Sequence, residues 1–134
     1  MLKFSKKKIL LIGLIFLVMI AGFMFWNIDI DVDEILADTN IGYVDLSNLE
    51  NGIYNGRHSA GLVEVELAVN IDNGKIIDIQ ILNHDNWRGG KAEKIVNEVV
   101  NKQSLDVDLV SGATISSKVI IKSVENALSN GKRI

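Results

Sequence analysis

Residues 62–82 read LVEVELAVNIDNGKIIDIQIL, and this stretch decides the fold. In each half, apolar residues alternate with polar or small ones, which gives each half one apolar face if it forms a strand. The apolar faces consist of Val63, Val65, Leu67 and Val69 in the first half, and of Ile77, Ile79 and Ile81 in the second. Asn73-Gly74 lies between them, a pair typical of two-residue hairpin turns because both positions take positive φ. The stretch therefore predicts an antiparallel hairpin with one buried face.

Further elements are predicted on both sides of the hairpin. A short strand is expected over residues 53–58, and residues 104–110, SLDVDLV, alternate in a way that favours another. Residues 91–102 and 118–132 carry apolar residues at helical spacing, and Gly131 is a plausible stop for the second helix. This order predicts an α+β fold: a small antiparallel sheet packed with two helices.

The N-terminal region predicts one transmembrane helix. Residues 9–26 carry no charge, and a helix of this length spans about 27 Å, close to the hydrocarbon core of a bilayer. Lysines at positions 3, 6, 7 and 8 precede it, which places the N-terminus in the cytoplasm and the rest of the chain outside. A cleaved signal peptide is the alternative. The run is long for one and lacks a small-x-small cleavage site, which favours an uncleaved anchor in the cell membrane.

These patterns divide the chain into four expected segments. They are a basic cytoplasmic flank (1–8), a transmembrane anchor (9–27), an acidic juxtamembrane spacer (28–50) and a folded domain (51–131). All 17 acidic residues lie beyond residue 26, against 10 of the 14 basic ones, so there is no basic stripe for nucleic acid. The chain has no cysteine and two histidines, which excludes thiol catalysis and disulfides and argues against haem or a redox metal.

Residues 108–117, DLVSGATISS, allow two interpretations. In the structural one, a helix begins near Ile115, Thr114 is its N-cap, and Ser117 replaces the usual Glu of a capping box. In the functional one, the same helix start attracts a phosphate, because its free amides and dipole favour negative charge. Gly112 and Ala113 would let the phosphate approach the backbone, beside the hydroxyl of Thr114. Local chemistry leaves both interpretations open.

The same stretch resembles the flavinylation motif of the FMN-binding domain family, Asp-x-x-Ser/Thr-Gly-Ala-Thr/Ser. The matching residues are Asp108, Ser111, Gly112, Ala113 and Thr114, with Ser117 as a further hydroxyl residue. The residues NGIYNG (51–56), the hairpin and the run from residue 91 to residue 108 are also similar to that family. The resemblance covers about residues 51–130, which identifies the expected domain over 51–131 as an FMN-binding domain.

The resemblance implies that Thr114 carries FMN through a phosphoester, after a separate flavin transferase has recognised Asp108, Ser111, Gly112 and Ala113. The implied function is electron relay between membrane or extracellular redox partners by an electron carrier rather than a stand-alone enzyme, with no catalytic residue and no metal site of its own. His84 and Trp87 are further candidates for contact with the flavin, by hydrogen bonding and stacking respectively. Each also has an ordinary structural explanation, as a surface histidine and as a loop aromatic.

Two other functions are weighed against this one. A non-redox binding module at the cell surface would keep the fold without the flavin. A hydrolytic enzyme would use Ser111 or Thr114 as its nucleophile, but no base partner stands at a telling spacing.

Overall fold

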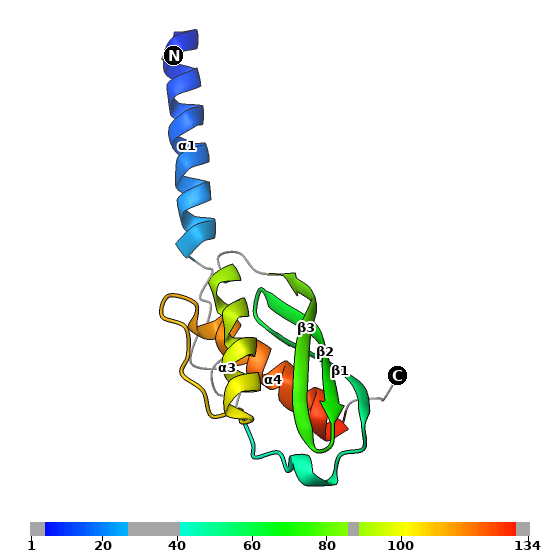
Figure 1. Ribbon diagram of the computed structural model, residues 1–134. Helices are drawn as coiled ribbons and strands as arrows, with labels where there is room; N and C mark the ends of the chain where they lie inside the picture. The colour runs from blue at the N-terminus through cyan, green and yellow to red at the C-terminus, as the bar shows by residue number, and fades with distance from the viewer. Residues whose placement is uncertain (1–4, 27–40, 86–88, 131–134) are drawn as a thin grey trace. The chain divides into compact units, whose positions relative to one another are not determined.

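The structure is a computed structural model that describes residues 5–26, 41–85 and 89–130. The chain forms two units, residues 1–31 and 32–134. The first contains helix α1 (Lys6–Trp26). The second, over its described residues, is an α+β domain of three strands and two helices (Figure 1). Its elements are β1 (Gly52–Ala60), β2 (Val63–Asp72), β3 (Lys75–Asp85), α3 (Ile95–Lys102) and α4 (Thr114–Asn130), with short 3-10 turns η1 (Leu46–Asn48) and η2 (Gly90–Lys94).

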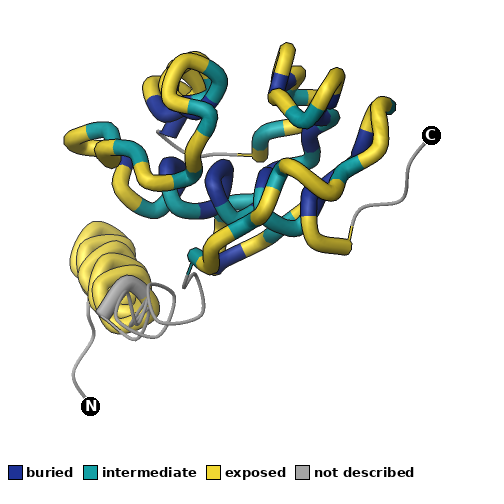
Figure 2. The backbone as a smooth tube through the Cα atoms, turned by 60° about the horizontal axis from the view of Figure 1, so that its bottom comes forward, coloured by how far each residue is buried: buried dark blue, intermediate teal, exposed yellow. Residues whose placement is uncertain are grey.

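Helix α1 is long and apolar enough to cross a membrane over Lys6–Met24, where its mean hydropathy is 2.2. The described side chains along this span are exposed (Figure 2). An N-terminal helix of this kind is either a signal sequence or a single membrane anchor. The predicted boundary at residue 27 lies outside the described residues.

The sheet is antiparallel in the order β1-β2-β3, which confirms the predicted hairpin. Asn73 and Gly74 have φ values of 49° and 70°, as a type I′ turn requires. The side chain of Asn51 fastens this turn to the entry of the domain. It donates to Asp72 Oδ1 at 2.6 Å and accepts from the Asn73 amide at 2.8 Å.

The prediction that Ile77 lies on the buried face of β3 is wrong. Asn70 pairs with Asp78 and Ile71 pairs with Ile76, so Ile77 is the extra residue of a β-bulge. The bulge shifts the side-chain alternation by one position: Ile76 is 2% exposed and Ile77 is 51% exposed. Beyond the bulge, Ile79 and Ile81 face the core as expected.

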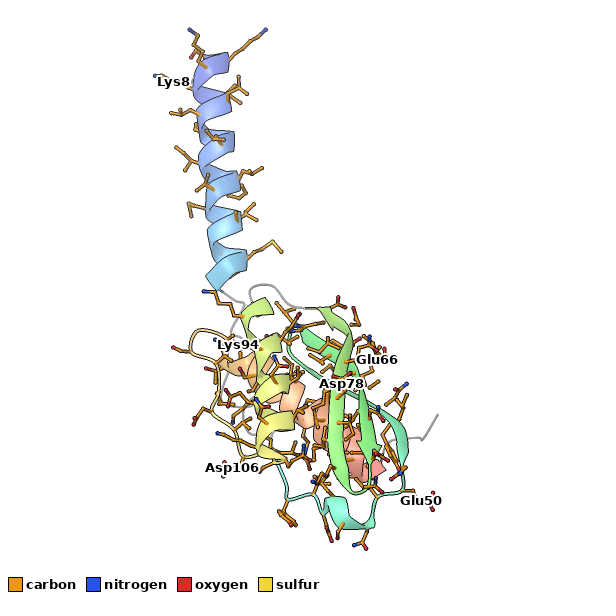
Figure 3. All side chains as sticks on the ribbon, viewed as in Figure 1. Lys8, Glu50, Glu66, Asp78, Lys94 and Asp106 are labelled. Atoms are coloured by element: carbon orange, nitrogen blue, oxygen red, sulfur yellow. The ribbon has the colours of Figure 1, made fainter. Side chains whose placement is uncertain are left out.

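The helices cover one face of the sheet. Helix α4 packs against β1 and β2, and α3 packs against β3. Residues buried on α4 include Val119, Ile120, Ile121, Val124, Ala127 and Leu128. The other face of the sheet carries the acidic side chains of Glu66 and Asp78 (Figure 3). Both predicted helices are confirmed, although the first turn of the 91–102 helix is the 3-10 turn η2.

Helix α4 approaches β1 most closely at Gly56. A Cβ atom on Gly56 would overlap the Ser123 carbonyl oxygen and lie 2.6 Å from the Ala127 backbone nitrogen. Nearby, Asn126 Nδ2 donates to the Arg57 carbonyl oxygen at 3.0 Å. The position therefore requires glycine, because any side chain would push the helix away from the strand.

The strand predicted over residues 104–110 is wrong, since the chain has no strand there. Gln103, which ends α3 with φ of 50°, explains the difference. Its side-chain amide accepts from the Ile76 N–H at 2.8 Å and donates to the Ile76 carbonyl at 2.7 Å. The Gln103 side chain thus satisfies the Ile76 N–H and carbonyl groups, to which a further strand beside β3 would have to bond.

Residues 41–49, called the strap from here on, belong to the folded unit although the sequence placed them in the acidic spacer. Ile41, Val44, Leu46 and Leu49 are partly buried against the core. The remaining residues of the predicted spacer, 28–40, lie outside the part of the chain that the structure describes. Figure 1 shows the strap, in cyan, entering β1 at the end of the domain where α4 finishes.

Candidate functional site

The residues before α4 form a tight turn. The Ala113 amide donates to the Val110 carbonyl at 2.9 Å, which places Ser111 and Gly112 at the two central positions. Gly112 has φ of 77°, as the third residue of a type II turn requires. Nothing lies within 4 Å of where a Gly112 side chain would begin. The turn is therefore a rigid backbone feature whose glycine is open to an approaching molecule.

Ser117 holds this turn against the helix. Its buried hydroxyl donates to the Ala113 carbonyl at 2.8 Å and accepts from the Val110 amide at 3.0 Å. The sequence assigned Ser117 to a capping box with Thr114, but its hydroxyl bridges the two ends of the turn instead. Its structural role is therefore to fix the conformation of residues 110–113.

Thr114 is the first residue of α4 rather than its N-cap. The first helical hydrogen bond runs from the Ser117 amide to the Ala113 carbonyl at 2.9 Å, so Ala113 occupies the N-cap position. The predicted capping role of Thr114 is therefore wrong. Thr114 is exposed, and it lies beside the exposed Ser111 and Gly112.

A cavity of about 610 Å³ lies along α4 and includes Leu109 and Lys118, which stand on either side of the turn in the sequence; we call it the α4 cavity. None of residues 110–117 is among its lining residues. Its volume is within the range typical of cofactor sites, about 300–1,000 Å³. It is lined by strap residues 41–47, by residues 103–107 and Leu109, by Ile76 of β3, and by Lys118, Ile121 and Leu128 of α4. Figure 3 labels Asp106 on the segment that forms one of these walls.

Thr114 stands at the head of the helical face that lines the cavity. At 3.6 residues per turn, Lys118, Ile121 and Leu128 all project within about 40° of the direction of Thr114. Lys118 follows one turn after Thr114 and is half-buried. No ion pair of Lys118 is found among residues 5–26, 41–85 and 89–130, so its ammonium group is available to an anion at this end of the cavity.

The strap wall of the cavity is held by Asp45. Its carboxylate accepts from the Ser47 amide at 2.9 Å, the Ser47 hydroxyl at 2.6 Å and Asn48 Nδ2 at 2.9 Å. The hydrogen bonds from the Ser47 side chain and backbone lower the pKa of Asp45 below its ordinary value. Asp45 is thus a charged N-cap that orders the strap at neutral pH.

The structure places the remaining predicted site residues as follows. Asp108 is exposed on the segment that leads into the turn. The His84 side chain is 2% exposed, and its Nδ1 lies 2.9 Å from Glu93 Oε1. His84 does not line the α4 cavity, so its predicted contact with a flavin stays a prediction. Trp87 lies outside the described residues.

None of the residues that line the cavity was predicted from the sequence as a site residue, and three of them show why. Lys118 had a detectable signal, since it follows Thr114 by four residues and shares its face of the helix. Tyr43 and Gln103 gave none, because only the folded chain brings residues 41–47 beside residues 103–107. The cavity is built from segments that are about 60 residues apart in the sequence, and no local pattern reports such a distance.

Two comparisons bear on the function of this site. A family model described as "FMN-binding domain" matches residues 60–129, which is more than half of the chain. A protein of Treponema pallidum (strain Nichols), described as "Uncharacterized protein", is 31% identical over 85 residues. That alignment covers 61% of this chain and 24% of the relative, so the match spans about a quarter of the relative's length. The family match includes the turn, Thr114 and Lys118.

Proposed function

Because this chain belongs to the FMN-binding domain family, we propose that it carries FMN covalently on Thr114 and relays electrons at the outer face of the cell membrane. The observation that carries the proposal is the position of Thr114. Thr114 is exposed and directly follows an open glycine turn, and Lys118, Ile121 and Leu128 on the same face of α4 line a cavity of cofactor size.

The residues present fit a flavin phosphate. Gly112 leaves the space beside the turn clear, and the N-terminus of the 17-residue helix α4 presents amides toward the phosphate position. Lys118 supplies a positive charge one turn further along the helix. The apolar walls of the cavity, such as Ile121 and Leu128, suit the ring system of the cofactor.

Attachment requires a separate flavin transferase that uses FAD and a divalent metal. The Thr114 oxygen forms a bond to the phosphorus of the FMN part, the hydroxyl proton is lost, and AMP leaves. The role of this chain would be to present the Thr114 hydroxyl at the exposed start of α4, directly after the turn. The bound flavin would supply one- and two-electron transfer, and the chain would bind, orient and shield it.

The N-terminal helix supports the proposed location. An uncleaved α1 would anchor the domain, and the lysines before it would keep the N-terminus in the cytoplasm. A covalent bond suits this location, because a dissociable cofactor would be diluted into the medium.

The test is to produce the chain together with a flavin transferase and to measure its intact mass. We expect a mass increment of one FMN on the unsubstituted chain and on Thr114→Ser, and none on Thr114→Ala. The increment should survive denaturation, as a covalent bond does. A chain that stays colourless and unmodified beside an active transferase would instead be a non-redox binding module, and an increment that persists in Thr114→Ala would place the flavin elsewhere.

A further inference from the structure

We propose that the isoalloxazine ring of the Thr114-bound FMN lies in the α4 cavity against Tyr43, an aromatic side chain supplied by the strap. This inference rests on the proposed function, because it concerns the flavin that Thr114 would carry. The family match begins at residue 60, so the strap lies outside the part of the chain that the comparison relates to FMN.

Tyr43 is held at the cavity by the residues on both sides of it. Ile41 and Val44 are partly buried against the core, and Asp45 caps the turn that follows. Tyr43 itself lines the cavity and is 94% exposed. An ordered backbone thus presents a large aromatic side chain at a cavity wall without packing it against the protein, which leaves its ring free to contact a ligand.

The strap lies within reach of a flavin that starts at Thr114. A Cβ atom on Gly42 would lie 3.1 Å from Glu125 Oε1, so the strap passes α4 near Glu125. Glu125 is eleven residues beyond Thr114, about 16 Å along the helix. An extended FMN molecule, from its phosphate through the ribityl chain to the far edge of the ring system, has a length comparable to this distance along the helix. Along α4 the cavity extends from Lys118 to Leu128, and Leu109 and residues 41–47 of the strap form other parts of its wall.

Aromatic stacking is the contact that the site offers to the ring. The cavity walls beside Tyr43 are largely apolar, and an isoalloxazine ring is flat and electron-poor. An offset stack of the isoalloxazine ring on the phenol ring of Tyr43 buries apolar surface of both rings. Stacking on an electron-rich ring favours the oxidised flavin over the reduced one. A stacked tyrosine also quenches flavin fluorescence, because it donates an electron to the excited ring.

These properties define the experiment, which uses the full chain produced with a flavin transferase and purified in detergent. The variants are Tyr43→Ala and Tyr43→Trp. Leu62→Ala is the matched control, because Leu62 is a large, 71% exposed residue that does not line the cavity. Fluorescence is measured per mole of attached FMN, so a variant that is loaded to a lower level is still informative.

We expect the attached flavin of the unsubstituted chain to be strongly quenched, with a short fluorescence lifetime. Tyr43→Ala should be several-fold brighter with a longer lifetime and a midpoint potential shifted upward. Tyr43→Trp should remain quenched, and Leu62→Ala should match the unsubstituted chain.

The failure of this inference differs from the failure of the proposed function. A Tyr43→Ala chain that carries the FMN increment with unchanged lifetime and potential would place the ring away from the strap. A chain without any FMN increment in its unsubstituted form would contradict both proposals.

Discussion

At the scale of single residues, the conformation of the turn before α4 depends on the buried hydroxyl of Ser117. Ser117 is fully buried and joins the Val110 amide to the Ala113 carbonyl. Ser111, by contrast, is exposed in the same turn and makes no side-chain hydrogen bond among those that the structure describes. Two serines six residues apart therefore have separable roles, one in the stability of the turn and one at its surface.

We predict that Ser117→Ala lowers the free energy of unfolding by about 2 kcal/mol, because it removes two hydrogen bonds and leaves the Val110 amide without its acceptor. Ser111→Ala should change it by less than about 0.5 kcal/mol, as is usual for exposed positions. Denaturation with urea measures both values. Equal stabilities of the two variants would contradict the bridging role of Ser117. From the resemblance, Ser111→Ala should instead lower the yield of FMN attachment.

At the scale of elements, the domain depends on the close contact of α4 with β1. Gly56 allows the helix backbone at Ser123 and Ala127 to approach the strand directly. The Ser123 hydroxyl adds a 2.8 Å hydrogen bond to the Val119 carbonyl, and it lies 3.3 Å from the Val65 carbonyl of β2. Because α4 also carries Thr114 and one wall of the cavity, a displacement of the helix would move both of them.

We predict that Gly56→Ala costs about 3 kcal/mol of stability, at the upper end of the usual cost of overpacking, because backbone atoms on α4 cannot move aside separately. Gly42→Ala is the control. Its added methyl group meets only the flexible Glu125 side chain at 3.1 Å, so a change within about 0.5 kcal/mol is expected. Chemical denaturation of both variants checks this, and a tolerated Gly56→Ala would mean that α4 is not fixed on β1 as described.

The same elements indicate what the sequence can and cannot predict. The hairpin and both helices followed from periodicity, because each buries one face. The exposure of Ile77 could not be predicted, because a bulge changes the alternation without changing the residue types. The missing strand after α3 depends on a contact between Gln103 and Ile76, 27 residues apart. For the site, the Thr114 motif was visible locally, whereas the strap wall arises only from folding.

At the scale of the whole molecule, the charge-free run of residues 9–26 within α1 precedes an acidic folded unit. Lysines precede this run, and seven acidic residues lie among positions 27–50 after it. This asymmetry favours one orientation in a membrane, because lysines near a span resist export. The folded unit that we propose to bind FMN would then lie outside the cytoplasm.

We predict that the chain is recovered from the membrane fraction with its N-terminal peptide intact, because no small-x-small site follows the apolar run. Mass spectrometry of the purified protein checks the N-terminus, and protease added to intact cells should degrade the domain but spare residues 1–8. A shortened chain in the medium would identify α1 as a cleaved signal sequence. Protection of the whole domain from the protease would contradict the orientation.

The turn before α4 is held by hydrogen bonds within the chain. Ser117 and the Val110–Ala113 hydrogen bond fix its conformation, while Gly112 and Thr114 remain accessible. If a flavin transferase recognises this turn, as we propose, it would meet a shape that exists only in the folded domain. The proposal then implies that folding precedes the attachment of FMN, and that a misfolded domain would stay without the cofactor.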